Sequence, residues 1–240
     1  MFQRENAFFS WSGGKDSALC LYKVMQSKQY NLRCLLTNIN SLHNRISMHG
    51  VRKNLLQMQA ASIGIPLQAI ELPAELSMEV YEAIMLKSIK ELKANGCNKA
   101  IFGDIFLEDL KLYREQQLNA VDIECIFPLW KIDTAALIKE FIDTGFKAII
   151  VCINENYLDK SFCGRMIDET FINDLPGNVD VCGENGEFHS FVFDGPIFSQ
   201  PIGFNKGEIV HKLYDAPKKK DTDDTTQNRY GFWFCDLLPA

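Results

Sequence analysis

The residues best suited to chemistry lie near the start of the chain, where residues 10–17 read Ser-Trp-Ser-Gly-Gly-Lys-Asp-Ser. An apolar run ending at Phe9 precedes them, and apolar residues at helical spacing follow over 18–25. A glycine turn that opens a helix directs backbone N–H groups and the positive end of the helix dipole at one point. Because Lys15 and serine hydroxyls stand beside that point, residues 10–17, here called the glycine loop, predict an anion site, most naturally for phosphates.

The spacing within the glycine loop matches neither of two common phosphate-binding motifs. Walker A needs a glycine where Phe9 stands and a hydroxyl where Asp16 stands, and the Rossmann Gly-x-Gly-x-x-Gly is absent. Residues 12–17, Ser-Gly-Gly-Lys-Asp-Ser, instead resemble the PP-loop of the ATP pyrophosphatases. That resemblance implies that the β and γ phosphates of ATP are bound as a unit. It also implies that a substrate oxygen attacks the α-phosphorus, so that pyrophosphate leaves and the substrate is adenylylated.

A second segment with chemical potential spans residues 182–190 and contains Asn185-Gly186 between two β-like runs. Asn-Gly favours a type I′ turn, so the segment predicts a β-hairpin. Glu184 and Glu187 then face each other across the turn, with side chains ~5 Å apart. Their repulsion predicts a raised pKa for one carboxyl and a pair that attracts a cation, and such a carboxylate could take a proton from ammonium. The alternative is an exposed tip whose glutamates splay apart.

Together the two segments resemble the diphthine ammonia ligase family. Its C-terminal signature, Glu-Gly-Gly-Glu-aromatic-His-Thr-Phe followed by Asp-Gly-Pro, is matched by residues 184–191 and 194–196, with Asn185 and Ser190 as mild replacements. Further matches extend over nearly the whole chain: Met48-His49, Gln59-Ala60, residues 63–66, Gly103-Asp104, Tyr113-Arg114 and residues 128–130. The resemblance implies an ATP-dependent ligase that joins ammonia to the carboxylate of diphthine, a modified histidine of translation elongation factor 2. AMP and pyrophosphate are the implied products.

Three alternative functions stay open. Residues 103–115 differ from the pattern of archaeal and eukaryotic family members, so the amidated carboxylate could instead belong to a small molecule such as a cobalamin precursor. A PP-loop enzyme that modifies tRNA is expected to carry a Cys-x-x-Cys pair and a basic extension, and this chain has neither. A nucleotide-sensing domain of the universal-stress type shares the general α/β architecture, but an intact Lys15 and the paired glutamates argue against it.

The elements that position these residues alternate between strand and helix. Besides the strand before the glycine loop, strands are predicted at 33–39, 67–72, 100–105 and 123–129, and helices at 49–63, 79–95 and 107–120. Short strands separated by helices are typical of parallel βαβ units, so we expect an α/β fold with a doubly wound, five-stranded parallel sheet of the HUP or PP-loop type. Ligands bind such sheets beyond the carboxyl ends of the strands, where polar or glycine residues gather in this sequence.

The predicted nucleotide and metal site combines the glycine loop with those strand ends. Its binding residues are Ser10, Ser12, Gly13, Gly14, Lys15, Asp16, Ser17, Thr37, Asn38, His49, Gly103 and Asp104. ATP and Mg²⁺ are the predicted cofactors, with Mg²⁺ bridging phosphate oxygens and Asp104 contacting the metal or the ribose. His49 could reach the nucleotide from the start of its helix, or be an ordinary helix residue without a role.

The predicted catalytic residues are Lys15, Arg114, Glu184 and Glu187. Lys15 would neutralise the charge that develops on the departing pyrophosphate. Arg114 would pair with a phosphate or with the acceptor carboxylate, and a structural ion pair is its alternative role. The predicted partners are ammonia and a carboxylate acceptor, and a homodimer is left open.

A change in sequence pattern, from alternating strands and helices to glycine-rich turns and strands, divides the chain into two predicted domains. Residues 1–131 form the ATP-binding domain, and residues 132–240 form a smaller α+β domain that carries the glutamate hairpin. Its elements are predicted as a helix around 137–142 and strands at 148–153, 179–183, 187–193, 209–214 and 230–235. Residues 217–229 contain no apolar residue apart from a proline, which predicts a mobile loop.

Composition favours a cytoplasmic protein. No apolar stretch approaches the ~20 residues that span a bilayer, and no signal peptide precedes the glycine loop. The net charge of −6 makes a nucleic-acid partner unfavourable. Eight cysteines without a Cys-x-x-Cys pair indicate reduced core thiols. A zinc site made of Cys152, Cys163, Cys182 and His189 is conceivable, but their spacing resembles no ligand framework.

Overall fold

The N-terminal half of the chain forms the parallel sheet that the sequence predicts. The structure, a computed structural model, describes residues 4–46, 49–74, 76–215 and 229–240. Within them five strands pair in parallel in the order β4-β2-β1-β5-β6: β1 (Glu5–Ser10), β2 (Tyr30–Asn40), β4 (Leu67–Leu72), β5 (Lys99–Ile101) and β6 (Glu124–Ile126). The short β3 (Arg45–Ile46) pairs antiparallel with the end of β2. The strand order changes direction at β1, so the glycine loop lies at the switch point of the sheet, where such folds bind ligands.

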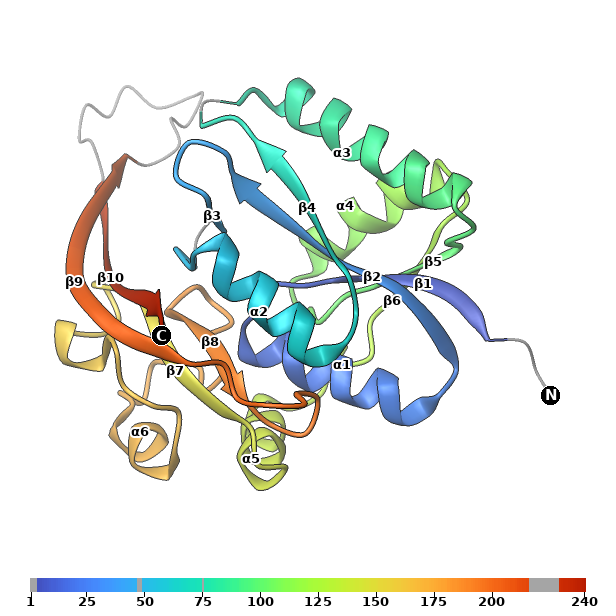
Figure 1. Cartoon of the computed structure of the whole chain (residues 1–240). Coiled ribbons are helices and arrows are strands. Elements are labelled where there is room, and N and C mark those ends of the chain that lie inside the picture. Colours follow the sequence, from blue (N-terminus) through green and yellow to red (C-terminus); the bar gives the residue numbers. More distant parts are fainter. Residues whose placement is uncertain (1–3, 47–48, 75, 216–228) are drawn as a thin grey trace.

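Helices cover both faces of this sheet (Figure 1). α1 (Lys15–Ser27) and α2 (Lys53–Ile63) share a core with one face, and α3 (Met78–Ala94) and α4 (Glu108–Asn119) with the other. The strand sequences explain this arrangement, because successive side chains of a strand point to opposite faces. Phe9 and Leu35 belong to the core with α1 and α2, whereas Phe8 and Leu36 belong to the core with α3 and α4. Both faces are apolar, so both must be covered.

The remainder of the chain builds an antiparallel sheet with the strand order β8-β7-β10-β9. Its strands are β7 (Lys147–Asn154), β8 (Phe188–Asp194), β9 (Phe204–Asp215) and β10 (Arg229–Pro239). The helix α5 (Thr134–Asp143) precedes β7, and a short 3₁₀ helix, η1 (Lys160–Phe162), and α6 (Glu169–Asp174) lie between β7 and β8. β7 is buried along all but its first residue.

One hydrophobic core spans the two sheets. It joins Leu19 of α1 and Leu55 of α2 with Phe141 of α5, Ile149 of β7 and Phe191 of β8, all of them buried. β8 is the strand of the second sheet that approaches the start of α1. The predicted division after residue 131 therefore separates two sheets that share a core. Whether it is also a boundary between two domains stays a prediction.

Two predictions about the C-terminal region are wrong. Residues 179–183 form no strand, and residues 181–187 are a series of turns that leads into β8, so no hairpin surrounds Asn185. Gly186 has a φ of 81°, but Asn185 does not have the positive φ that a type I′ turn also requires. The Asn-Gly pattern was misleading because the buried carboxylate of Glu187, rather than a partner strand, accepts hydrogen bonds from the backbone of this segment.

The other predicted elements are present with small differences. β5 and β6 end earlier than predicted, at Ile101 and Ile126, and neither η1 nor α6 was predicted. Of the predicted mobile loop, residues 217–228 lie outside the described residues, and Arg229 begins β10. Among the described helices, none is both long and apolar enough to cross a membrane.

Candidate functional site

The strand β8 holds the glycine loop in place. The backbone N of Lys15 donates a hydrogen bond to Ser190 Oγ at 3.1 Å, and Val192 N donates to the carbonyl O of Gly13 at 2.9 Å. Gly13 has a φ of 76°, and a Cβ atom on it would lie 2.6 Å from Leu56 Cδ2, so both its conformation and its surroundings require glycine. The loop thus takes its shape partly from a strand far away in the sequence.

The side chain of Gln59, on α2, connects the same two segments. Its Nε2 donates to the carbonyl oxygens of Gly13 (3.1 Å) and Val192 (2.6 Å), and its Oε1 accepts from Trp11 Nε1 (3.0 Å). Gln59 is 0% exposed, so these bonds satisfy a polar group that water cannot reach. The conformation of the glycine loop is therefore fixed from α2 and β8 together.

Lys15 lies in this frame with its side chain almost completely buried. Its Nζ donates to both carboxylate oxygens of Asp16, at 2.8 and 2.6 Å, and lies 5.6 Å from the ring centre of Phe188. Burial opposes its charge, but Asp16, Cys182 and Glu184 together outweigh burial, and the pKa of Lys15 is raised. The hydroxyl oxygens of Ser12 and Ser17 lie 3.0 Å apart on the same loop. A cation, two hydroxyls and the first-turn amides of α1 other than that of Lys15 are the donors that the predicted phosphate site needs.

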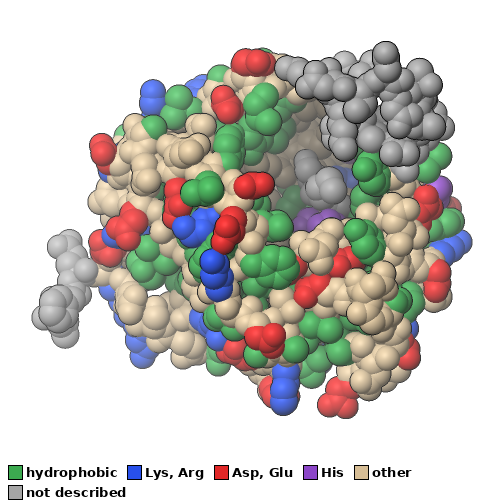
Figure 2. All heavy atoms as spheres, turned by 180° about the vertical axis from the view of Figure 1, so that it is seen from behind, with side chains coloured by type: hydrophobic (Ala, Val, Ile, Leu, Met, Phe, Trp, Pro, Cys, Tyr) green, Lys and Arg blue, Asp and Glu red, His purple; other side chains and the backbone are tan. Residues whose placement is uncertain are grey.

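A cavity of about 820 Å³ opens beside the glycine loop. Figure 2 shows a hollow on the rear face, with histidine side chains inside it and hydrophobic side chains around its rim. Its polar wall includes the predicted site residues Ser10, Ser12, Gly14, Lys15, Asp16, Ser17, Thr37, Asn38, His49, Gly103, Asp104, Arg114 and Glu184. Its apolar wall comes largely from α3 and α4 and the ends of the strands beneath them. Ligand pockets commonly have volumes of roughly 300–1,000 Å³, so this one has room for a nucleotide.

Glu187, one of the predicted catalytic residues, holds the turn before β8 rather than lining the cavity. Glu187 is 0% exposed, and its carboxylate accepts from the backbone N of Asp180 (3.0 Å) and Asn185 (2.8 Å). Asp180 Oδ1 in turn accepts from the backbone N of Cys182 (2.9 Å) and Glu184 (3.3 Å). The expectation that two glutamates oppose each other across a hairpin is therefore wrong. The catalytic role of Glu187 stays a prediction, and its observed contacts are structural.

Glu184, presented by this turn, lines the cavity. Burial raises the pKa of Glu184 to about 8, the Asp16 carboxylate adds repulsion, and the Lys15 ammonium opposes both. A raised carboxyl pKa was predicted from repulsion within the glutamate pair, whereas its main cause is desolvation. A carboxyl group that titrates near neutral pH can exchange protons with a ligand.

Two imidazole rings meet at the cavity wall. His49 precedes α2 and His189 belongs to β8, and their rings stack with centres 4.5 Å apart and planes at 24°. Burial lowers the pKa of His49 to about 4 and lowers that of His189 as well, and the nearby Lys15 ammonium acts in the same direction. Both rings are thus neutral at neutral pH. His49 Nδ1 and His189 Nε2 are buried without a hydrogen-bond partner, so a bound ligand or water would stabilise them.

Asp104 and Arg114 form an ion pair at the carboxyl end of β5. Arg114 Nε lies 3.0 Å from Asp104 Oδ2, and the guanidinium carbon lies 4.3 Å from the ring centre of Phe102. This is the ion pair considered as the alternative role of Arg114, although both side chains also line the cavity. A Cβ on the neighbouring Gly103 would lie 3.2 Å from the carbonyl O of Asp16. Glycine at this position lets the end of β5 approach the first turn of α1.

The end of β2 contributes Thr37 and Asn38 to the cavity wall. Thr37 is 3% exposed, and its hydroxyl Oγ1 has no hydrogen-bond partner. In the part of the chain that the structure describes, no three His, Cys, Asp or Glu side chains converge closely enough to hold a metal ion. That finding includes the zinc ligands considered from the sequence, and all eight cysteines are free thiols.

The sequence analysis did not identify the residues that hold the site together. Ser190 and Gln59 appeared only as parts of family motifs, and Asp180 was not noticed at all. Gln59 had a signal of its own, because it is a polar residue on the apolar stripe of α2, next to the buried Leu55 and Leu56. A long polar side chain in such a stripe needs buried partners. No comparable local signal marks Asp180.

Comparisons with known proteins agree with the motifs. The profile of the diphthamide synthase N-terminal domain matches residues 6–122, and that of the diphthamide synthase C-terminal domain matches residues 133–219. The diphthine–ammonia ligase of Danio rerio is 28% identical over 233 residues, covering 85% of this chain and 88% of that protein. The diphthine–ammonia ligase of Bos taurus is 24% identical over 233 residues, covering 85% of each chain. Because the two profiles together match most of its residues, the chain belongs to the diphthamide synthase family.

Proposed function

We propose that this protein is an ATP-dependent ligase that joins ammonia to the carboxylate of diphthine and releases AMP and pyrophosphate. Family membership and the diphthine–ammonia ligase relatives support an ammonia ligase that acts in diphthamide synthesis. The observation that carries the proposal is a shared cavity, in which Lys15 of the glycine loop and the carboxyl group of Glu184 line one space. A phosphate-binding element and a proton acceptor are thereby brought together.

The residues at one side of the cavity fit ATP, which would supply the adenylyl group that activates the acceptor carboxylate. Lys15 would exchange its bond to Asp16 for phosphate oxygens and neutralise charge on the departing pyrophosphate. Ser12, Ser17 and the first-turn amides of Asp16 and Ser17 would donate to the same oxygens, since the amide of Lys15 already donates to Ser190. The hydroxyl of Thr37, which has no partner in the protein, could donate a hydrogen bond to a nucleotide base or ribose.

Mg²⁺ is usually held in proteins by one or two carboxylates together with substrate phosphates. We assign the carboxylate contact to Asp104, which Arg114 already orients toward the strand ends. Arg114 would then act mainly by fixing Asp104 and by adding positive charge beside the phosphates.

Glu184 would remove the proton that the attacking nitrogen must lose. When ammonia adds to the activated carboxyl carbon, a C–N bond forms, the C–O bond to AMP breaks, and the nitrogen carries an extra proton. Because the pKa of Glu184 is about 8, most of its carboxyl groups are protonated at pH 7 and the ionised fraction rises as the pH approaches 8, while its affinity for a proton exceeds that of an ordinary carboxylate. The neutral His49 and His189 add no positive charge that would repel ammonium from this position.

The experiment is product analysis with the purified protein, ATP, Mg²⁺, ammonium and elongation factor 2 that carries diphthine. We expect AMP, pyrophosphate and the amidated residue in equal amounts. Formation of ADP and orthophosphate would contradict the assignment of the glycine loop. A parallel reaction offers small-molecule carboxylates, and amidation of these alone would replace diphthine as the acceptor while leaving the reaction type intact.

A further inference from the structure

His49 is carried by a strap, defined here by residues 44–46 and 49–53, that connects the end of β2 to α2. A backbone hydrogen bond from Ile46 N to Val51 O, 2.9 Å long, closes the strap on itself. Both of these side chains are buried, so the strap is seated in the core at this point. From there its backbone projects His49 against the glycine loop, where a Cβ on Gly14 would lie 3.2 Å from His49 Cε1.

A single carboxylate of the second sheet binds both sides of the strap. Asp236 Oδ1 accepts from Arg45 Nη1 (2.7 Å) and Arg52 Nε (3.1 Å), and Asp236 Oδ2 accepts from Arg52 Nη2 (2.6 Å). Arg45 Nη1 also donates to the carbonyl O of Gly50 at 2.7 Å. The two guanidinium groups outweigh the burial of Asp236 and lower its pKa to about 2, so these charge-assisted bonds persist at neutral pH.

Packing against β10 fixes the strap in a second way. Gly50 has a φ of 68°, and a Cβ on it would lie 2.9 Å from Phe234 Cδ1, so the strap backbone rests directly on this ring. The pairing of β10 with β9 shifts register between Cys235 and Leu237, which is the position of Asp236. Such irregularities re-aim side chains out of a regular sheet. Here the irregularity coincides with the carboxylate that reaches the strap.

We infer that Asp236 is a positioning residue of the nucleotide site, which through Arg45 and Arg52 keeps His49 stacked on His189 at the cavity wall. The inference rests on the proposed function, because it treats this cavity as the place where the nucleotide binds. Asp236 is not one of the lining residues, so its influence on a ligand must pass through the strap. The final strand of the second sheet thereby controls a residue of the connection between β3 and α2.

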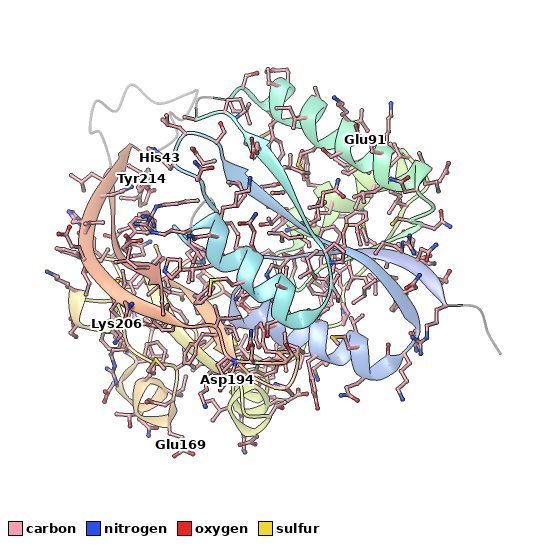
Figure 3. The ribbon with its side chains drawn as sticks, in the orientation of Figure 1. His43, Glu91, Glu169, Asp194, Lys206 and Tyr214 are labelled. Atoms are coloured by element: carbon pink, nitrogen blue, oxygen red, sulfur yellow. The ribbon has the colours of Figure 1, made fainter. Side chains whose placement is uncertain are left out.

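The test compares Asp236→Asn with a matched control, Asp194→Asn. Asp194 belongs to the same sheet, pairs with Lys147 at 2.8 Å and is 24% exposed, against 21% for Asp236. Figure 3 shows His43, in the turn before the strap, at the upper left of the molecule and Asp194 well below it. We expect Asp236→Asn to weaken ATP binding roughly tenfold, which corresponds to one charge-assisted hydrogen bond, and Asp194→Asn to leave it unchanged. Asp236→Glu, which keeps the charge, should recover part of the affinity.

Two further measurements separate positioning from a general loss of stability. If Asp236 acts through His49, the double variant Asp236→Asn/His49→Gln should bind ATP no more weakly than His49→Gln alone. In the absence of nucleotide, NMR titration of the His49 ring should show a pKa that returns from about 4 toward its ordinary value in Asp236→Asn, because water reaches the displaced ring. None of these variants changes the groups that face the His49 position. They are Lys15 on α1, and His189 and the Ser190 carbonyl on β8.

Unchanged His49 titration in Asp236→Asn, or additive losses of ATP affinity in the double variant, would overturn the inference. So would an equal loss of affinity in Asp194→Asn. If the unaltered protein bound no ATP, the proposed function would fail. The NMR titration would then still decide whether Asp236 positions His49, so the two failures can be told apart.

Discussion

The backbone N–H of Lys15 donates a hydrogen bond to the hydroxyl of Ser190 at 3.1 Å, across 175 residues of sequence. One partner belongs to the glycine loop and the other to the C-terminal signature, so the two segments that the sequence singled out are in direct contact. The contact needs only a hydroxyl oxygen at position 190. Threonine, which the family pattern has there, would supply the same acceptor, and this explains why serine is a mild replacement.

Lys15→Ala should slow AMP formation on the order of 10²-fold or more, because a buried cation beside the departing pyrophosphate is lost. The control is Lys23→Ala on the same helix, where the side chain pairs with Glu140 outside the cavity. Rates of AMP release for both variants are measured at saturating ATP. A Lys15→Ala rate close to that of the unaltered protein would remove Lys15 from the mechanism.

Glu184→Gln should leave ATP binding intact and reduce amide formation on the order of 10²-fold or more, the usual contribution of a general base. Only the ionised carboxylate accepts a proton, so the rate of the unaltered protein should rise with pH and level off above about 8. The variant should lose this rise. The measurement is a pH profile of amide formation at a constant concentration of free ammonia. The same pH profile in both proteins would contradict the role of Glu184.

Glu187→Gln should mainly lower stability. A glutamine offers one acceptor oxygen where the carboxylate of Glu187 provides two, which between them serve Asp180 N and Asn185 N. A buried donor left without its acceptor costs about 1–3 kcal/mol, which urea unfolding can measure. The competing expectation from the sequence was a catalytic base at this position. A Glu187→Gln protein of full stability that binds ATP but forms no amide would support that expectation instead.

Thr37→Val should weaken nucleotide binding a fewfold without lowering stability. Valine has nearly the same shape as threonine, and the hydroxyl that it removes is buried without a partner in the protein. Losing one neutral hydrogen bond to the nucleotide would correspond to about 0.5–1.5 kcal/mol. Calorimetric titration with ATP gives the affinity, and thermal unfolding provides the control. Unaltered affinity would place the nucleotide away from the end of β2.

The parts of the fold that depend on local patterns could be predicted from the sequence. Alternation of apolar runs and helical stripes located the five parallel strands and α1 to α4, because each face of the sheet must bury its side chains. The glycine loop was recognisable because its chemistry lies in consecutive residues. The turn at 181–187 was not, since Asn-Gly has a local preference that the buried carboxylate of Glu187 overrides at this position.

Contacts between distant segments could not be predicted from sequence patterns. Nothing near Gln59 reveals that it bonds to Gly13 and Val192, and nothing near Asp236 reveals its two arginine partners. A raised pKa was expected for one of Glu184 and Glu187 from their mutual repulsion, whereas Glu184 has a raised pKa mainly because it is buried, and burial is a property of the folded chain rather than of the neighbouring residues. The sequence therefore predicted the chemistry of the site better than the arrangement of its residues.

During synthesis on the ribosome, the glycine loop emerges long before the strand that shapes it. A chain that stops ahead of Ser190 contains the complete motif but lacks the acceptor for Lys15 N and one of the two donors to the carbonyl O of Gly13, namely Val192 N. Contacts between segments so far apart form late in folding, because the long intervening loop must be closed first. If the cavity binds nucleotide as proposed, unfinished chains should not sequester it, and the ability to bind it would mark a chain in which β8 has been made.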